Sequence, residues 1–363
     1  MMYKFLSLPV SVVLTTLSTL CLSVAPASAT LLVGNTQGDN IVIFNEQTGA
    51  FLGDFITSGQ GGLKAPDNLL YGPDGDLYVS SGDTVANSAI LRYDGLTGAF
   101  KGVFASGGGL TRPYGSVFGP DGYLYVSSFL SDEILRYDGT TGAFVDVFAS
   151  GNGLSGGVNG PNGLLFDGAG NLYVTTEGSV NGTFPGLPSQ VLRFSPGQSS
   201  PTVFIDQPTP SPDSFGFVSL LGLAIGPDND LFVSDFANDI RRYDLSTGQF
   251  VSTLATNYTQ TVPSNNFIGS LTFDDSGLLY TVGFDFTQNN DGAILRYDGV
   301  TGSPLPSFGN PSSVFVPTTD KLRRPIGILY TPNQLTPVPE PAATAGLFLL
   351  GMFFLVSRQK SKQ

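Results

Sequence analysis

Short apolar runs separated by turn-forming residues recur along the chain between residues 31 and 330. One run returns five times, as ILRYD at 90–94, ILRYD at 134–138, VLRFS at 191–195, IRRYD at 240–244 and ILRYD at 294–298. Runs of this length that are rich in aromatic and β-branched residues and bounded by Gly, Pro, Asn and Asp are typical of β-strands. The pattern therefore predicts an all-β protein built from a repeated unit.

Each repeat predicts four strands, which we call a, b, c and d. The run above is the c-strand, and the b-strands read DLYVSS from 76, YLYVSS from 123, NLYVTT from 171, DLFVSD from 230 and LLYTVG from 278. Tight turns such as 73–75 (PDG) and 94–98 (DGLTG) join the strands, because glycine supplies a positive φ and aspartate bonds back to its own backbone. These aspartates are predicted to form turns, since PDGD offers too few oxygens at alternate positions for calcium.

The two ends of the repeat region together supply the four strands of one further repeat. Residues 31–56 supply strands b, c and d without an a-strand, whereas residues 325–330 (PIGILY) supply an a-strand with nothing after it. Pairing them would close the array into a ring and remove the exposed sheet edges of an open array. We therefore expect an all-β, six-bladed β-propeller of four-stranded antiparallel blades, spanning residues 30–332, in which the N- and C-terminal strands share the closing blade.

The blades resemble NHL-type repeats, and more distantly gluconolactonase and regucalcin-like proteins and streptogramin lyases. The similarity lies in segments such as 161–166 (PNGLLF) with 170–174 (GNLYV), and 233–244 (VSDFANDIRRYD). It implies the fold, whereas activities vary widely among propellers. Streptogramin lyases depend on a histidine that this chain lacks, and the metal ligands of gluconolactonases cannot be matched here residue by residue.

The N-terminal segment, residues 1–29, has the pattern of a secretory signal peptide. Lys4 precedes an apolar stretch, and Ala27 and Ala29 stand at the −3 and −1 positions of a predicted cleavage site. The alternative is an uncleaved N-terminal transmembrane helix. We expect an exported protein of the periplasm, outer cell surface or extracellular space.

A second apolar segment, 342–356, lies near the C-terminus after a predicted linker at 333–337 and is followed by a basic end. It is short for a membrane span of about 20 residues. The whole segment 338–363 resembles the PEP-CTERM sorting signal of Gram-negative bacteria that make extracellular polysaccharide, with motif residues Val338, Pro339, Glu340 and Pro341 and the basic Arg358. The resemblance implies processing by an exosortase and contact with the membrane only through the terminal segments. The alternative is a simple C-terminal anchor.

Composition excludes several classes of chemistry. The chain has no histidine, and its single cysteine, Cys21, lies in the predicted signal peptide, so imidazole, thiolate and disulfide chemistry are absent from the predicted mature protein. The net charge of −13 and the lack of a basic stripe disfavour nucleic acid as a partner.

The predicted site lies over the central channel, on the face that carries the b–c and d–a loops. These loops are predicted to be long, at 177–189, 285–292, 206–218, 255–267 and 317–324, and long loops on a rigid scaffold commonly bind ligands. Lys64, Arg112, Arg323 and Arg324 stand just before a-strands, and acidic residues in or beside b–c loops are expected either to pair with them or to bind a metal. The candidate ligand or metal residues are Asp67, Asn68, Asn162, Glu177, Asp235 and Asp285, whose oxygens would suit Ca²⁺ or Mg²⁺.

Two functions remain open from the sequence. The first is a non-catalytic binding or scaffold protein of the cell surface or extracellular matrix, with extracellular polysaccharide, a surface protein or a small ligand as partner. The second is a histidine-independent, calcium-dependent lactonase-like hydrolase or lyase, for which no catalytic residue can be assigned. The sequence favours the first.

Overall fold

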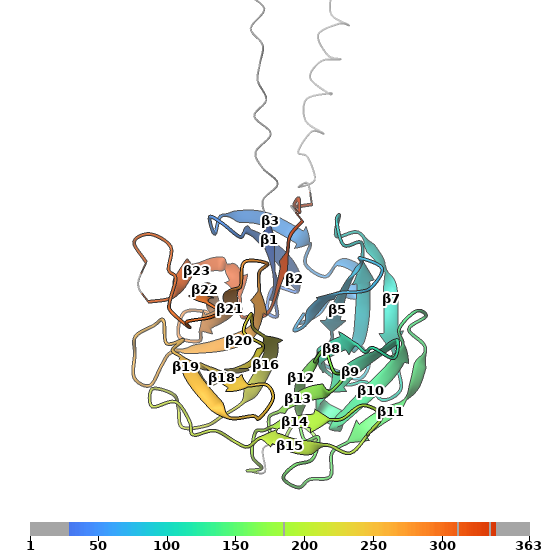
Figure 1. Cartoon of the computed structure of the whole chain (residues 1–363). Coiled ribbons are helices and arrows are strands. Elements are labelled where there is room, and N and C mark those ends of the chain that lie inside the picture. Colours follow the sequence, from blue (N-terminus) through green and yellow to red (C-terminus); the bar gives the residue numbers. More distant parts are fainter. Residues whose placement is uncertain (1–28, 184–185, 311, 334, 339–363) are drawn as a thin grey trace, which may run out of the picture.

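The computed structural model describes residues 29–183, 186–310, 312–333 and 335–338. Its strands form six four-stranded antiparallel sheets arranged as a ring (Figure 1). The closing blade contains β24 (Pro325–Thr331), β1 (Thr30–Asn35), β2 (Asn40–Asn45) and β3 (Phe51–Ile56), in that order. The predicted six-bladed β-propeller is thus confirmed.

The other five blades each use four consecutive strands, with the a-strand innermost. Blade 1 contains β4 (Leu69–Tyr71), β5 (Leu77–Ser81), β6 (Ala89–Tyr93) and β7 (Phe100–Ser106); blade 2 contains β8 (Pro113–Phe118), β9 (Tyr123–Ser128), β10 (Glu133–Asp138) and β11 (Phe144–Ser150). Blade 3 contains β12 (Pro161–Phe166), β13 (Leu172–Thr176), β14 (Val191–Phe194) and β15 (Thr202–Ile205). Blade 4 contains β16 (Leu220–Ile225), β17 (Asp230–Asp235), β18 (Ile240–Asp244) and β19 (Phe250–Leu254); blade 5 contains β20 (Asn266–Phe273), β21 (Leu278–Asp285), β22 (Asp291–Asp298) and β23 (Val314–Arg323). Two single-turn 3₁₀ helices, Gln60–Gly62 and Phe129–Ser131, lie in loops.

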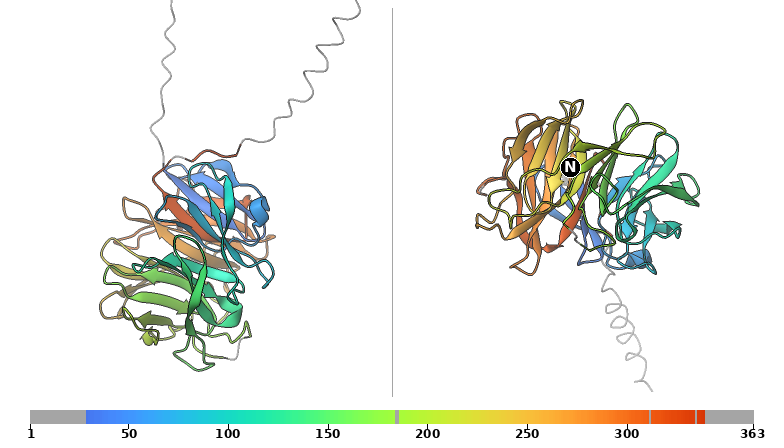
Figure 2. Two further views of the ribbon diagram at one scale, coloured as in Figure 1. Left: turned by 90° about the vertical axis from the view of Figure 1, so that its right-hand side faces the viewer. Right: turned by 90° about the horizontal axis from the view of Figure 1, so that it is seen from below.

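The closing blade joins the two ends of the repeat region by strand pairing. Strand β1 pairs antiparallel with β24, from Thr30 opposite Thr331 to Gly34 opposite Gly327, and pairs with β2 on its other side. Figure 2 shows the red C-terminal strand beside the blue N-terminal strands. The hydrogen bonds of β1 to β24 therefore depend on a segment about 300 residues away in the sequence, as the sequence predicts.

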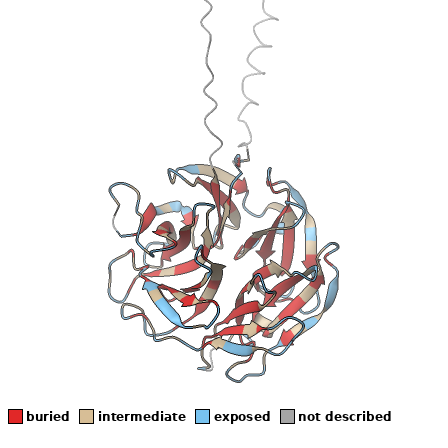
Figure 3. Ribbon diagram, in the orientation of Figure 1, coloured by how far each residue is buried: buried red, intermediate tan, exposed pale blue. Residues whose placement is uncertain are grey.

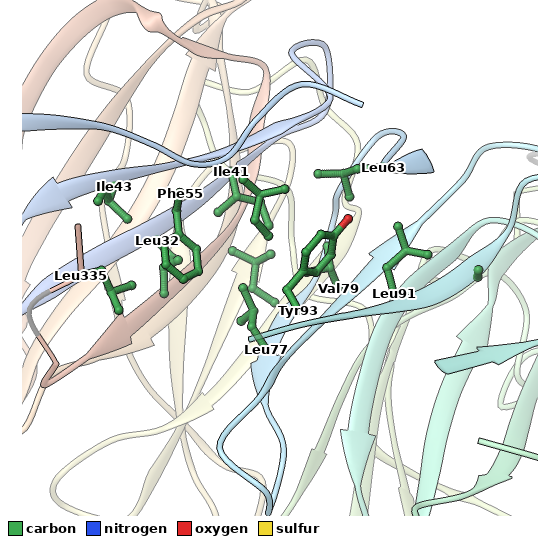
Figure 4. Close-up of a cluster of buried hydrophobic side chains, with 13 residues drawn as sticks. Leu32, Ile41, Ile43, Phe55, Leu63, Leu77, Val79, Leu91, Tyr93 and Leu335 are labelled. Atoms are coloured by element: carbon green, nitrogen blue, oxygen red, sulfur yellow. The ribbon is translucent and has the colours of Figure 1, made fainter. Parts of the chain in front are cut away.

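Apolar side chains form buried clusters that join neighbouring blades. Figure 3 colours the buried residues of the strands red. The cluster in Figure 4 joins the closing blade to blade 1: Leu32, Ile41 and Phe55 face Leu77 and Tyr93, all fully buried. Burial of each such side chain contributes roughly 1.5–3 kcal/mol. Blade-to-blade packing is therefore what stabilises the ring.

The repeated Arg-Tyr pairs contribute to this packing, as expected. The hydroxyls of Tyr93, Tyr137 and Tyr297 each donate to a backbone carbonyl of the loop that precedes their own blade, at 2.8 Å. Arg92 and Arg136 point to the other side, where they contact the carboxylates of Asp76 and Asp146. The turn aspartates also behave as predicted, because Asp94, Asp138, Asp244 and Asp298 accept hydrogen bonds from backbone amides of their own turns.

One predicted loop is wrong. Residues 317–323 were expected to form a d–a loop, but they continue β23 as far as Arg323. The extension has a partner because β22 begins early, at Asp291, which lies opposite Arg323. The connection between these two strands, 299–313, is correspondingly long and lies on the opposite face from the b–c and d–a loops.

A ring of glycines allows the inner strands to approach one another. A Cβ atom on Gly115, Gly163, Gly222, Gly269 or Gly327 would lie 2.2–2.8 Å from the backbone of the next inner strand. Blade 1 carries Asn68 at this position, and its Oδ1 accepts hydrogen bonds from the Ser116 backbone N–H and hydroxyl, at 3.2 and 2.8 Å. The side chain of Asn68 therefore replaces direct backbone contact between β4 and β8.

The described ends of the chain also belong to the closing blade. In the segment predicted as a linker, Leu335 is buried in the cluster of Figure 4. The N–H of Val338, the first residue of the predicted sorting motif, donates to the Asp54 carbonyl at 2.8 Å. The carbonyl of Ala29 accepts from the Glu46 N–H. Ala27, Pro339, Glu340, Pro341 and Arg358 lie outside the described residues. Within the described part of the chain, no helix is long and apolar enough to cross a membrane.

Candidate functional site

A cavity of about 1110 Å³ opens at the centre of the ring, on the face that carries the b–c and d–a loops. We call this face the loop face. The cavity wall comes from the inner strands and from loops of several blades, among them residues 36–37, 129–130, 177–178, 186–187 and 216–219. The rigid inner strands hold the side chains at their ends in fixed positions around this opening.

Two positions of the repeat supply several polar residues of the wall. The residue after the first proline of the inner segment is Asp67 in blade 1, Tyr114 in blade 2 and Asn162 in blade 3, and all three line the cavity. The residue before that proline is Ala65, Arg112, Gly160 and Arg324 in blades 1, 2, 3 and the closing blade. Because the repeat places equivalent residues at equal height, the differences between these residues determine the chemistry of the cavity.

Asp67 is a buried carboxyl group without a partner. Only 8% of the residue is exposed, and its carboxylate forms no hydrogen bond or ion pair with the residues that the structure describes. Burial raises the pKa of Asp67 to about 7; the charges of Arg112 and Arg324 oppose this shift, and that of Glu177 adds to it. A carboxyl group in this state can donate or accept a hydrogen bond near neutral pH.

Arg112 and Arg324 flank Asp67 from the neighbouring blades. Their guanidinium groups lie over aromatic rings, 5.0 Å from the centroid of Tyr114 and 5.6 Å from that of Phe284. Neither forms an ion pair with a described carboxylate, whereas Lys64 pairs with Asp39 at 3.0 Å and Arg323 lies 3.7 Å from Asp291. The predicted pairing between loops therefore holds for two of the four basic residues, and the other two remain free.

Glu177 occupies the next part of the wall and is held by neutral donors. The side-chain amide of Asn162 donates to Glu177 Oε1 at 2.9 Å. The backbone N–H of Glu177 donates to the Gly160 carbonyl. Burial raises the pKa of Glu177, while hydrogen bonds from Asn162 and Ser219 oppose the shift. The cavity is thus lined by the carboxyl groups of Asp67, Asp83 and Glu177, by Lys64, and by two arginines without an ion pair to a described carboxylate.

Four of the six predicted ligand or metal residues line this cavity, and two do not. Asp67, Asn68, Asn162 and Glu177 come together there. Asp235 is instead fully buried beside Arg241, at 2.7 Å, and accepts hydrogen bonds from the backbone of Ser219 and Ala237. Asp285 accepts from the backbone and hydroxyl of Thr287 and stabilises its own loop.

The residues on the wall do not form a typical calcium site. Calcium takes six to eight oxygen ligands, yet the described residues contain no group of three or more His, Cys, Asp or Glu arranged to hold a metal. Asn68 Oδ1 is already occupied by Ser116, and Asn162 directs its NH₂ rather than its oxygen at Glu177. Two guanidinium groups beside Asp67 would also repel a cation.

An aromatic cluster borders the cavity on the blade 4 side. Phe217 and Phe236 line the cavity, and Phe236 stacks on Phe267 with ring centroids 4.5 Å apart. Phe217 is 41% exposed and Phe215 is 50% exposed. The sequence interpretation missed this cluster, although the signal was present as six phenylalanines in loops and at strand ends, at 215, 217, 236, 267, 284 and 286.

Comparison with known proteins supports the fold alone. The sequence matches no protein family and no curated protein. Among solved structures, a chain of the crystal structure of a nidogen/laminin complex aligns with a TM-score of 0.60 and 15% identity over 85% of this chain and 99% of that one. A protein of unknown function from Bacteroides caccae aligns with a TM-score of 0.54 and 14% identity over 84% and 99%. A putative gluconolactonase reaches 0.48 and 18% over 64% and 74%. The chain is therefore a β-propeller, and these distant structural neighbours support its fold.

Proposed function

We propose that this chain is a binding propeller that holds its ligand in the central cavity of the loop face without catalysing a reaction. The observation that carries the proposal is the convergence of Asp67, Glu177 and two unpaired arginines in one cavity of about 1110 Å³. Ligand sites are typically concave, largely apolar and supplied with a few convergent polar groups. Arg112 and Arg324 form no ion pair with a described carboxylate, and charged groups of this kind on a cavity wall favour a partner from outside the chain.

The predicted export signals extend this proposal to location. A protein released after Ala29 and processed at the segment 338–341 by an exosortase would present the propeller outside the cytoplasm, at the cell surface or in the extracellular matrix. Neither Ala29 nor the described residues 335–338 line the cavity. Mass spectrometry of the exported protein is expected to find Thr30 at its N-terminus, whereas an intact Met1 would contradict the predicted cleavage.

Obstruction of the cavity provides the test of function. The full-length chain, kept in solution with mild detergent, would be screened by thermal unfolding against organic acids, saccharides and peptides, because a ligand of the native state raises Tm. We expect the ligands that raise Tm to lose this effect in Leu130→Trp, which fills the cavity from the 3₁₀ helix at 129–131. The control is Leu96→Trp, an exposed position on the opposite face. Ligand effects that survive in Leu130→Trp would contradict the proposal.

The alternative is a calcium-dependent hydrolase or lyase that uses the same cavity. The observation in its favour is that Asp67 and Glu177, two carboxyl groups with raised pKa values, face one opening. Millimolar calcium added after removal of bound metal by a chelator would then raise Tm by several degrees, and Glu177→Gln would abolish this increase. We expect no such increase, because the arginines and the occupied amides leave too few oxygens for the ion.

A further inference from the structure

The backbone at the cavity mouth does not require arginine. The residue before the inner proline has a positive φ in four blades, of 45° at Ala65, 54° at Arg112, 61° at Gly160 and 48° at Arg324. This conformation costs roughly 1–2 kcal/mol for a residue with a side chain. Glycine would therefore satisfy the fold best, as in blade 3, and the arginines of blade 2 and the closing blade need another explanation.

The backbone around both arginines is held in place by hydrogen bonds. The N–H of Arg112 donates to the Ser88 hydroxyl at 2.8 Å, and that of Arg324 donates to the Asn290 carbonyl at 2.7 Å. Each side chain then lies over an aromatic ring, which limits the directions that the guanidinium can take. Both groups are thus positioned before any ligand arrives, and pre-organisation of this kind lowers the entropic cost of binding.

The two arginines lie on either side of Asp67 around the ring. Inner strand β4 is flanked by β24, which follows Arg324, and by β8, which follows Arg112. This is the part of the ring where Asn68 replaces the glycine that elsewhere allows close strand contact. Asn68 therefore spaces β4 from β8 beside Arg112, whereas Gly327 keeps β24 close to the Asp67 backbone on the Arg324 side.

We propose that the cavity binds an organic monocarboxylate, with its carboxylate held by Arg112 and Arg324 and its body directed toward the aromatic side of the cavity at Phe217 and Phe236. The inference rests on the proposed function, for which it names the ligand class. The planar fork of a guanidinium matches the two oxygens of a carboxylate. The apolar wall favours an organic anion over a bare inorganic one.

The other charges of the cavity set the charge of the ligand. Asp67 and Glu177 face the same space, so a phosphate or dicarboxylate would bring its second negative charge toward one of them. A monocarboxylate avoids this repulsion, and the protonated form of Asp67 can donate a hydrogen bond to it. A ligand with one negative charge and a ring or apolar body is therefore the best match.

Calorimetric titration of the full-length chain tests the ligand class. The probes are benzoate, D-galacturonate and D-glucuronate, each compared with a neutral counterpart, benzyl alcohol, D-galactose or D-glucose, and with inorganic phosphate. We expect at least one carboxylate to bind while its neutral counterpart and phosphate bind at least tenfold more weakly. Arg112→Gln and Arg324→Gln are each expected to weaken the binding by about tenfold or more.

The matched control is Lys321→Gln, which removes the same charge from an exposed residue outside the cavity and should leave the affinity within twofold. Equal binding of a neutral counterpart, tighter binding of phosphate, unchanged affinity in both arginine variants, or no carboxylate binding at 10 mM would overturn the inference. A neutral probe whose binding is lost in Leu130→Trp would refute the ligand class but leave the proposed function intact. Binding that survives in Leu130→Trp would refute both.

Discussion

Asp67→Asn is expected to stabilise the propeller at pH 8 by up to about 4 kcal/mol in the absence of ligand. The folded-state pKa of about 7 exceeds the ordinary value of 3.8, so the folded protein binds more protons than the unfolded chain between these pH values. Stability contributed by the neutral carboxyl is complete below pH 3.8 and is lost as pH rises through 7. One pKa unit corresponds to about 1.4 kcal/mol, which gives the size of the effect.

Urea denaturation of the wild type and the variant between pH 4 and pH 8.5 measures this difference directly. The free energies of unfolding should be similar near pH 4 and should diverge up to about pH 7.5, because asparagine resembles the protonated carboxyl and does not titrate. Asp320→Asn, at an exposed site on β23, is the control and should show no such divergence. A wild type that is as stable as Asp67→Asn at pH 8 would show that Asp67 is stabilised as a carboxylate.

Gly142→Ala is expected to destabilise the protein by about 2–5 kcal/mol. Gly142 lies in the c–d turn of blade 2 with φ of 72°, and a Cβ there would lie 1.8 Å from the backbone oxygen of Phe104 in β7 of the preceding blade. The left-handed backbone costs roughly 1–2 kcal/mol for alanine, and displacement of a neighbouring strand adds a further 1–3 kcal/mol. The same arrangement recurs at Gly98 and Gly248, so the glycine of this turn is an interblade contact.

The matched control for this prediction is Gly153→Ala. Gly153 has a similar φ of 68°, but no atom lies within 4 Å of the position that its Cβ would take. It should therefore cost only the backbone component, roughly 1–2 kcal/mol. Equal losses in the two variants, measured by chemical denaturation, would contradict the assigned interblade role of Gly142.

Much of the fold can be predicted from the sequence because its signals are local and repeated. The turn aspartates and glycines mark strand ends, and the unmatched strands at 31–56 and 325–330 predict the shared blade. The length of β23 could not be predicted, since its last residues pair with the early start of β22 rather than with a turn signal of their own. The length of β23 therefore depends on its pairing with β22 in the folded blade.

The site was less predictable, because the role of a polar residue depends on its partner. Asp235 looked like a ligand at a strand end, but it pairs with Arg241. The sequence contains a clue that the interpretation missed, since the b-strand DLFVSD and the c-strand IRRYD both depart from the repeat in blade 4. A buried acid and a buried base that appear in the same copy of a repeat are best explained by each other.

Two basic residues of the cavity, in contrast, lack the partners that the sequence led us to expect. Arg112 and Arg324 were expected to pair with acidic loop residues, yet both remain free, and only the fold shows that Asp67 lies between them without contact. Their unusual backbone conformation could not be derived from the proline that follows each of them. The departures from the repeat at Asn68, Arg112 and Arg324 can thus be interpreted only when the fold shows that all three line the same cavity.

The account is tested most directly by a crystal structure of the full-length chain with the tightest-binding monocarboxylate. The account predicts density for the ligand in the central cavity, with carboxylate oxygens about 3 Å from the guanidinium nitrogens of Arg112 and Arg324. Ligand density outside the cavity would contradict the proposed function, and a metal ion held between Asp67 and Glu177 would favour the hydrolase or lyase alternative instead.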